Sequence, residues 1–256
     1  MCIDNKKYDI QICEITLAKE IAKDTFDFTI FCPELAKKSK VGQFVHIYLP
    51  HRTLRRPISI CDISKDSLRI VFQIRGEGTR ELANFKKGDK LDVLGPLGKG
   101  FNLKDKSKKA LLVGGGIGVP PLLATAKHYG ENATVAVGFR NKESVILEKD
   151  FTENNCKLKI ATDDGSYGHN GLVIDLFEGE KPDIIYACGP QAMLKAVADF
   201  AKKNGIECEI SLEERMACGI GACLGCATKL LDENEKEYFG HVCKDGPVFD
   251  YKKVVI

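Results

Sequence analysis

The chain is 256 residues long, which is enough for one large domain or for two or three small ones. Hydrophobic residues make up 44% and charged residues 29%, a composition typical of a soluble chain with a full core. The 38 Lys and Arg side chains nearly balance the 36 Asp and Glu, so we expect no nucleic-acid partner. The N-terminus lacks the apolar region of a signal peptide, and glycines and prolines interrupt the longest apolar run, at 110–126. We therefore expect no membrane association and a cytoplasmic location.

Residues 1–104 have the pattern of short strands separated by turns. Apolar and polar residues largely alternate, as in half-buried strands, in four segments: 10–15, 26–31, 44–49 and 68–74. A further strand follows the turn at Lys87-Gly88, and no long helical pattern intervenes. These features predict an antiparallel β-barrel domain over residues 1–104.

Three segments of this block are suited to a flavin nucleotide. Arg56 can neutralise a pyrophosphate, and the hydroxyl of Ser59 can hydrogen-bond the edge of a flavin ring. The strand at 71–74 runs into a glycine loop at 76–79 that suits a phosphate, and Gly95-Pro-Leu-Gly forms a third turn. Arg-Pro-x-Ser alone could equally be a solvated turn. The three segments in this order on a small barrel predict a bound flavin.

Residues 105–210 change character after a polar link at 105–109. Buried strands are expected at 110–116, 134–139, 158–162 and 184–188, and helical stretches lie between them. The pair Pro120-Pro121 is expected to open one helix, and another is expected over 191–204. Strands that alternate with helices predict a Rossmann-like α/β domain with a parallel sheet covered on both faces.

Two glycine turns follow strands of this block. The first contains Gly114, Gly115, Gly116 and Gly118, and it reads G-x-G-x-x-P, so the usual dinucleotide fingerprint is incomplete. Alone it could bind a dinucleotide or be a structural turn. The second is Cys188-Gly189-Pro190. Two such turns at strand ends form the crevice in which open α/β sheets bind ligands, which indicates a nicotinamide nucleotide.

The choice between NAD and NADP depends on charge near the ribose. A carboxylate suits a free ribose hydroxyl, whereas a basic side chain suits a 2′-phosphate. Asp163 and Asp164 end one strand, and Arg140 follows its neighbour. We favour NAD, although both aspartates are equally typical of turns.

The eleven cysteines fall into two groups. Seven are scattered along the chain and are expected to be small buried hydrophobes: Cys2, Cys13, Cys32, Cys61, Cys156, Cys188 and Cys208. The other four have the C-x4-C-x2-C spacing with a distant fourth member that is typical of a plant-type 2Fe–2S cluster: Cys218, Cys223, Cys226 and Cys243. Structural zinc is the alternative, but it favours paired C-x2-C knuckles at both ends, and Cys243 stands alone. We expect residues 211–256 to form a small cluster domain, too short to fold on its own apolar core.

Together these motifs resemble the ferredoxin–NADP reductase superfamily, through Arg56-Pro-Ile-Ser, the Gly114–Leu122 turn and Cys188-Gly-Pro. More narrowly, the segment from Leu212 through the cysteines is similar to the electron transfer subunits of dihydroorotate dehydrogenase B. The similarity extends over essentially the whole chain. It implies FAD contacts by nine residues: Arg56, Pro57, Ile58, Ser59, Val71, Phe72, Gln73, Gly78 and Thr79.

The resemblance also implies a partner and a pathway. The partner is a catalytic subunit that holds FMN and oxidises dihydroorotate in pyrimidine (UMP) biosynthesis, in a heterotetramer with two copies of each subunit. Electrons would pass from FMN through the cluster and FAD to NAD+, with no general base needed in this chain. A flavin subunit of a cytosolic hydrogenase, sulfide dehydrogenase or ferredoxin–NADP transhydrogenase shares this layout. A zinc-bound interaction module on a degenerate reductase scaffold is a further alternative.

Overall fold

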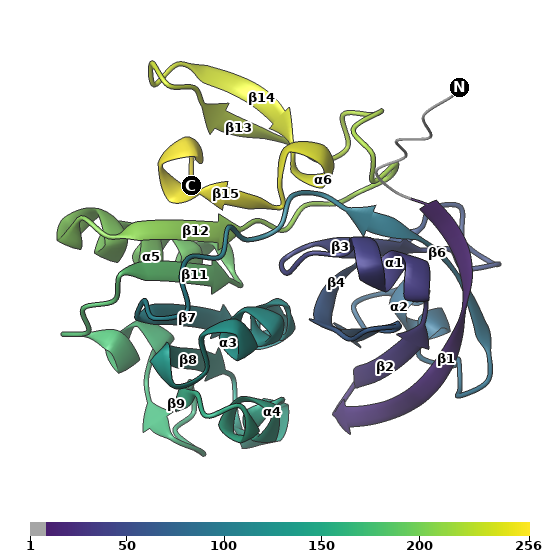
Figure 1. The fold of residues 1–256 in the computed structure, drawn as a ribbon, viewed down its shortest axis with the longest axis horizontal. Helices are drawn as coiled ribbons and strands as arrows, with labels where there is room; N and C mark the ends of the chain where they lie inside the picture. Colours follow the sequence, from purple (N-terminus) through teal and green to yellow (C-terminus); the bar gives the residue numbers. More distant parts are fainter. Residues whose placement is uncertain (1–8) are drawn as a thin grey trace.

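The computed structural model describes residues 9–256, so Cys2 and the first eight residues of the predicted barrel domain lie outside the described residues. Six antiparallel strands close a barrel in the order β1-β2-β5-β4-β3-β6 (Figure 1). Their bounds are β1 (Asp9–Ala22), β2 (Thr25–Phe31), β3 (Phe44–Ile47), β4 (Arg56–Ile63), β5 (Ser67–Gln73) and β6 (Lys90–Leu97). Two short helices, α1 (Pro33–Lys38) and α2 (Glu77–Leu82), lie between strands. Alternate residues such as Phe28 and Ile30 fill the barrel core, as the sequence pattern predicts.

The Arg56–Ser59 segment is the beginning of a strand and not a solvated turn. It opens β4, which pairs with β3 on one side and with β5 on the other. Proline at the second position removes one ladder donor, which a strand tolerates near its end. The segment therefore has a fixed backbone inside the barrel wall.

The second domain is built on a seven-stranded sheet in the order β10-β9-β8-β7-β11-β12-β15. Six strands run parallel: β7 (Ala110–Gly115), β8 (Ala133–Phe139), β9 (Lys157–Thr162), β10 (His169–Asn170), β11 (Ile184–Cys188) and β12 (Glu207–Ser211). The α-helices are α3 (Leu123–Tyr129), α4 (Glu148–Glu153) and α5 (Gln191–Asn204). The five 3₁₀ segments are η1 (Gly116–Gly118), η2 (Pro120–Leu122), η3 (Gly130–Asn132), η4 (Lys142–Ser144) and η5 (Val173–Phe177). The predicted fold class, a β-barrel followed by a parallel-sheet domain, is confirmed.

The two prolines begin a 3₁₀ turn, and the α-helix proper starts at Leu123. Proline cannot donate a backbone hydrogen bond, so the tighter turn precedes the helix at no cost in lost bonds. The predicted helix over 191–204 coincides with α5.

The C-terminal segment lies across the top of both domains in Figure 1. It contains the hairpin β13 (Ala227–Leu231) and β14 (Glu237–His241), then α6 (Val242–Asp245), β15 (Val248–Asp250) and η6 (Tyr251–Lys253). Strand β15 pairs antiparallel with β12 at the edge of the large sheet. Leu230, Val242 and Phe249 belong to the same hydrophobic cluster as side chains of β7, β11 and α5. The segment thus shares its core with the sheet domain, which supplies the apolar contacts that so short a stretch cannot provide alone.

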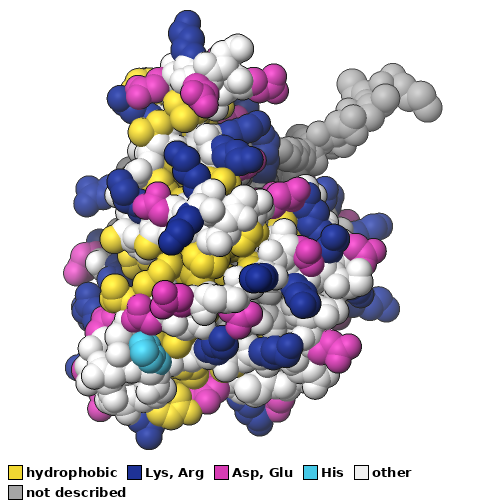
Figure 2. All heavy atoms as spheres, turned by 90° about the vertical axis from the view of Figure 1, so that its left-hand side faces the viewer, with side chains coloured by type: hydrophobic (Ala, Val, Ile, Leu, Met, Phe, Trp, Pro, Cys, Tyr) yellow, Lys and Arg dark blue, Asp and Glu magenta, His cyan; other side chains and the backbone are white. Residues whose placement is uncertain are grey.

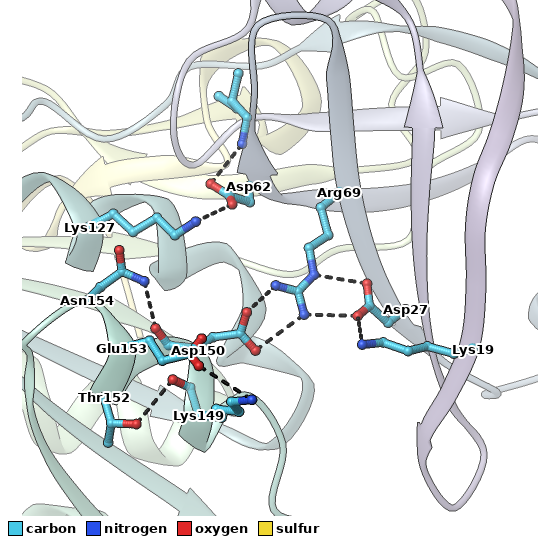
Figure 3. A network of polar contacts seen from close by, with 11 residues as sticks. Lys19, Asp27, Asp62, Arg69, Lys127, Lys149, Asp150, Thr152, Glu153 and Asn154 are labelled. Carbon is cyan, nitrogen blue, oxygen red and sulfur yellow. Dashed lines mark hydrogen bonds and ion pairs between the residues drawn. The ribbon is translucent and has the colours of Figure 1, made fainter.

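Ion pairs join the barrel to the sheet domain (Figure 3). Arg69 of β5 donates two hydrogen bonds to Asp27 of β2, at 3.0 and 2.9 Å, and also pairs with Asp150 of α4. Lys127 of α3 pairs with Asp62 of β4. These contacts fix the relative position of the two domains on the side of α3 and α4.

Six of the seven scattered cysteines are described, and all six are buried, which confirms their predicted role as small core residues. On the face of the sheet domain shown in Figure 2, basic and acidic side chains are interspersed around apolar strips. No helix in residues 9–256 is both long and apolar enough to cross a bilayer.

Candidate functional site

The four C-terminal cysteines form two pairs. The Sγ atoms of Cys218 and Cys223 lie 3.4 Å apart. In the second pair, the backbone N–H of Cys243 donates to Sγ of Cys226 at 3.4 Å. Two thiolates on one tetrahedral metal ion are expected about 3.8 Å apart from a metal–sulfur bond of about 2.3 Å. The first pair is therefore close to the spacing of two ligands on one iron, and the N–H contact brings Cys226 and Cys243 together as a second pair.

Backbone N–H groups of the loop point at these sulfur atoms. Sγ of Cys218 accepts from the N–H groups of Ile220 and Ala222, at 3.5 and 3.3 Å, and Sγ of Cys243 accepts from that of Gly221 at 3.2 Å. Gly219 has a positive φ of 73°, which turns the chain so that the next N–H groups face inward. Burial opposes ionisation of Cys218, but these N–H groups lower the pKa of its thiol to about 6.

The donor set suits a two-iron cluster better than a single ion. A 2Fe–2S cluster needs two thiolates on each of two irons, together with amide N–H groups directed at sulfur. Both features are present, so the residues fit the cluster that the cysteine spacing predicts.

The predicted flavin residues meet at one rim of the barrel. A Cβ added to Gly78 would lie 1.9 Å from Nε of Arg56, so the guanidinium lies directly over the N-terminus of α2. The Thr79 hydroxyl accepts the N–H of Arg75 at 2.8 Å and shapes this loop. The Arg56 guanidinium and the backbone N–H groups at the N-terminus of α2 can both bind phosphate oxygens.

The remaining predicted flavin residues lie on β4 and β5. Pro57 and Ser59 are half-buried, and Ile58 points into the barrel core. Val71 and Phe72 are 3% and 2% exposed, so they present little side-chain surface to any ligand. Gln73 ends β5 just before the loop.

The two glycine turns of the sheet domain lie against each other. Strands β7 and β11 are neighbours, with Gly114 in register with Cys188. A Cβ on Gly118 would lie 2.4 Å from the carbonyl oxygen of Cys188, and one on Gly115 would lie 2.8 Å from Pro190. Only glycine permits this approach, which places both turns at the carboxyl edge of the sheet, where nucleotides bind.

The thiol of Cys188 at this edge is influenced by the charge of Glu213. Burial, with a smaller effect from the charge of Glu213, raises the pKa of the Cys188 thiol to about 12. Glu213 is exposed, but partial desolvation by its surroundings raises the pKa of its carboxyl, and the charge of Arg75 opposes that shift. The sequence analysis did not identify Glu213, although its place five residues before Cys218 was a possible signal.

The residues considered for the choice of nucleotide lie at the ends of β8 and β9. Asp164 accepts the N–H and the hydroxyl of Ser166, at 2.9 and 2.6 Å, and both bonds lower the pKa of its carboxyl. Asp164 is thus engaged in the turn, while Arg140 is exposed. The preference for NAD over NADP stays a prediction on these residues.

A second residue that the sequence analysis missed is His46 of β3. Its side chain is fully buried, and neither ring nitrogen has a hydrogen-bond partner in the described part of the chain. Burial, with the charges of Arg55 and Arg56, lowers the pKa of His46 to about 4, although the backbone of Cys218 opposes the shift. The imidazole is therefore neutral at pH 7.

Known proteins are similar to this chain in sequence and in fold. Residues 213–255 match the family model described as the iron-sulfur cluster binding domain of dihydroorotate dehydrogenase B. The chain is 41% identical over 244 residues to "Dihydroorotate dehydrogenase B (NAD(+)), electron transfer subunit" of Caldanaerobacter subterraneus subsp. tengcongensis, covering 93% of this chain and 94% of that protein. The subunit of the same name from Streptococcus mutans serotype c is 41% identical over 249 residues, covering 93% and 95%.

Solved structures of electron-transfer proteins resemble this chain in fold. A chain of an NADH-dependent reduced ferredoxin-NADP oxidoreductase, described for flavin-based electron bifurcation, superposes with a TM-score of 0.83 at 33% identity, covering 96% of this chain and 90% of that one. Phthalate dioxygenase reductase shares the fold, with a TM-score of 0.61 at 19% identity over 92% of this chain and 77% of that one. Identity to the curated subunits is higher and extends over nearly their full length. The chain belongs to the family of electron transfer subunits of dihydroorotate dehydrogenase B.

Proposed function

We propose that this chain carries electrons between a dihydroorotate-oxidising catalytic subunit and NAD+, using a 2Fe–2S cluster and FAD. The main observation behind the proposal is that four cysteines form two pairs beside the β-barrel, with amide N–H groups directed at their sulfur atoms. A flavin exchanges a hydride with a nicotinamide and single electrons with a cluster, so it links the two kinds of chemistry. The chain itself needs no general base.

Its residues bind and orient the carriers. Arg56, with the N-terminus of α2, would hold the flavin phosphates, and Pro57 and Ser59 would contact the FAD. The glycine turns at Gly114–Gly118 and at 188–190 hold the nicotinamide nucleotide. The cluster is bound by Cys218 with Cys223 and by Cys226 with Cys243. Residues 1–104, 105–210 and 211–256 would then serve FAD, NAD and the cluster in turn.

The name of the relatives, an electron transfer subunit, implies a catalytic partner. We propose that the partner holds FMN and that two copies of each subunit assemble. The rival function, a flavin subunit of a ferredoxin–NADP transhydrogenase, would pair the chain with a multi-cluster subunit instead. Co-purification decides between them: an FMN protein active on dihydroorotate supports the proposal, and a multi-cluster partner contradicts it.

The substitution Cys223→Ser tests the ligand assignment. Losing one thiolate of the first pair should abolish the cluster absorption and most of the iron, while FAD stays bound because the barrel is intact. The matched control is Cys156→Ser, which changes a buried cysteine of the sheet domain. Iron content, the visible spectrum and flavin content are measured on anaerobically purified protein. An unchanged cluster spectrum in Cys223→Ser would refute the ligand set.

A further inference from the structure

His46 of β3 lies between the predicted flavin site and the predicted cluster loop. In the antiparallel pair β3–β4, His46 is directly opposite Pro57, and Phe44 is opposite Ser59. Residues directly opposite each other project from the same face of a sheet. Val45 and Ile58 fill the barrel core, so His46 and Phe44 point outward together with the two flavin residues.

The cluster loop covers this outward face. A Cβ added to Gly219 would lie 2.6 Å from Nδ1 of His46, so the imidazole packs directly on the loop backbone next to Cys218. Nearby, the N–H of Lys99 donates to the carbonyl of Gly246 at 2.5 Å, and Phe44 packs at the same junction. The cluster loop therefore packs on the same outer face of the barrel to which Pro57 and Ser59 project.

Space filling does not explain a histidine at this position. Its ring is 0% exposed, and within residues 9–256 neither nitrogen has a partner in good hydrogen-bond geometry, although the backbone of Cys218 lies close enough to act on the ring. Buried polar atoms without partners cost free energy, and Leu or Phe would fill the volume without that cost. Unpaired buried polar groups are rare, and they are often explained by a function or by a bound group.

We propose that His46 is a positioning residue that couples the flavin site to the iron–sulfur cluster. Its imidazole holds the Cys218–Gly219 backbone against strand β3, beside Pro57 of β4, and forms the side-chain bridge between the carriers. With both groups bound, the cluster and the flavin would supply the one-electron chemistry, the electron lost by one being the electron gained by the other. The imidazole keeps its own electrons and proton. This inference rests on the proposed function and assigns the contact between its two carriers.

The test uses the complete complex with its catalytic partner and compares His46→Leu with His46→Asn. Leucine fills the space without polar atoms, whereas the asparagine amide can place a nitrogen near the position of Nδ1. The control is His128→Asn on α3, since Nε2 of His128 contacts the Lys104 carbonyl at 2.9 Å, in another part of the molecule. Stopped-flow absorbance follows flavin reduction by NADH, and rapid-freeze EPR follows reduction of the cluster. Redox titration gives the cluster potential, and FAD and iron are assayed per chain.

In His46→Leu we expect unchanged reduction of the flavin by NADH. Transfer between flavin and cluster should slow by about 10- to 100-fold, the usual cost of losing a group that supports a metal ligand. A tenfold change in the oxidation equilibrium of the cluster would appear as a shift of about 59 mV in its potential. His46→Asn should restore most of the transfer rate, and His128→Asn should match the unchanged protein.

Loss of the cluster in His46→Leu but not in His46→Asn would also support the contact. An unchanged transfer rate and cluster potential in His46→Leu would overturn the inference, and so would equal effects of Leu and Asn. Absence of FAD and iron from the unsubstituted complex would instead refute the proposed function, which is a separate result.

Discussion

The substitution Arg69→Met should destabilise the barrel more than any exposed change on its surface. Arg69 makes a two-bond contact with Asp27, at 3.0 and 2.9 Å, and the Asp27 side chain is only 1% exposed. Without the guanidinium, the buried carboxylate keeps only Lys19, at 3.4 Å and half exposed. Breaking a buried pair from one side costs about 3–5 kcal/mol because a charge is left without a partner. We expect about 3 kcal/mol, the lower end, since Arg69 is itself partly exposed and Lys19 remains.

A double-mutant cycle in urea, followed by far-UV circular dichroism, measures this effect. Asp27→Asn and the combined Arg69→Met, Asp27→Asn protein complete the cycle. The combined protein should be more stable than Arg69→Met alone, because no buried charge is left unpaired. Asp150→Asn is the matched control: it removes the other partner of Arg69, whose side chain is 29% exposed (Figure 3). It should cost at most about 1 kcal/mol, as partly exposed pairs do.

The reasoning fails if Arg69→Met and Asp150→Asn destabilise the protein equally. It also fails if adding Asp27→Asn to Arg69→Met lowers stability further. Either result would show that Arg69 contributes to the free energy of unfolding mainly through its contact with Asp150 in the other domain, and not by pairing with the buried Asp27 carboxylate.

Two further predictions concern the nucleotide edge. In Gly118→Ala, the new Cβ would lie 2.4 Å from the Cys188 carbonyl oxygen and push the two turns apart. Steady-state kinetics should therefore show a higher KM for NADH, with FAD and iron contents unchanged. An unchanged KM would contradict the packing argument. For Cys188, burial raises the folded-state pKa to about 12 from a reference of 9.0, so the folded protein keeps a proton that the unfolded chain releases above pH 9. The stability contributed by this thiol is full below pH 9 and declines as the pH rises toward 12. Cys188→Ala should flatten that decline in urea titrations at increasing pH, and equal slopes in both proteins would argue against a buried neutral thiol.

The sequence predicts best those features that depend on local pattern. Alternation locates most barrel strands, and the helix over 191–204 is delimited by a proline before it and Gly205 after it. The cysteine ligands are recognisable because their spacing reflects the size of a cluster. Strand β4 is less visible, since arginine and proline at its beginning imitate a turn.

Features created by distant segments are not predictable in this way. Strand β15 has only three residues, and it is a strand because the edge of β12 offers partners. His46 occupies an outward position of β3, where alternation predicts contact with solvent, yet it is fully buried. The pattern shows which residues leave the barrel core, but it does not show that a loop some 170 residues later covers that face.

The same dependence on distant segments explains why the cluster loop can be short. Its hairpin and helix take their core from the sheet domain, its last strand pairs with β12, and Gly219 packs on the barrel at His46. The loop is thus fixed from two sides by domains that have their own cores. Glycine turns and N–H···S hydrogen bonds can then position the four cysteine sulfur atoms. In a free peptide these weak interactions would not fix the conformation of the loop. A carrier fixed in this way keeps a constant distance to the flavin, and constant distance is what a relay of single electrons requires.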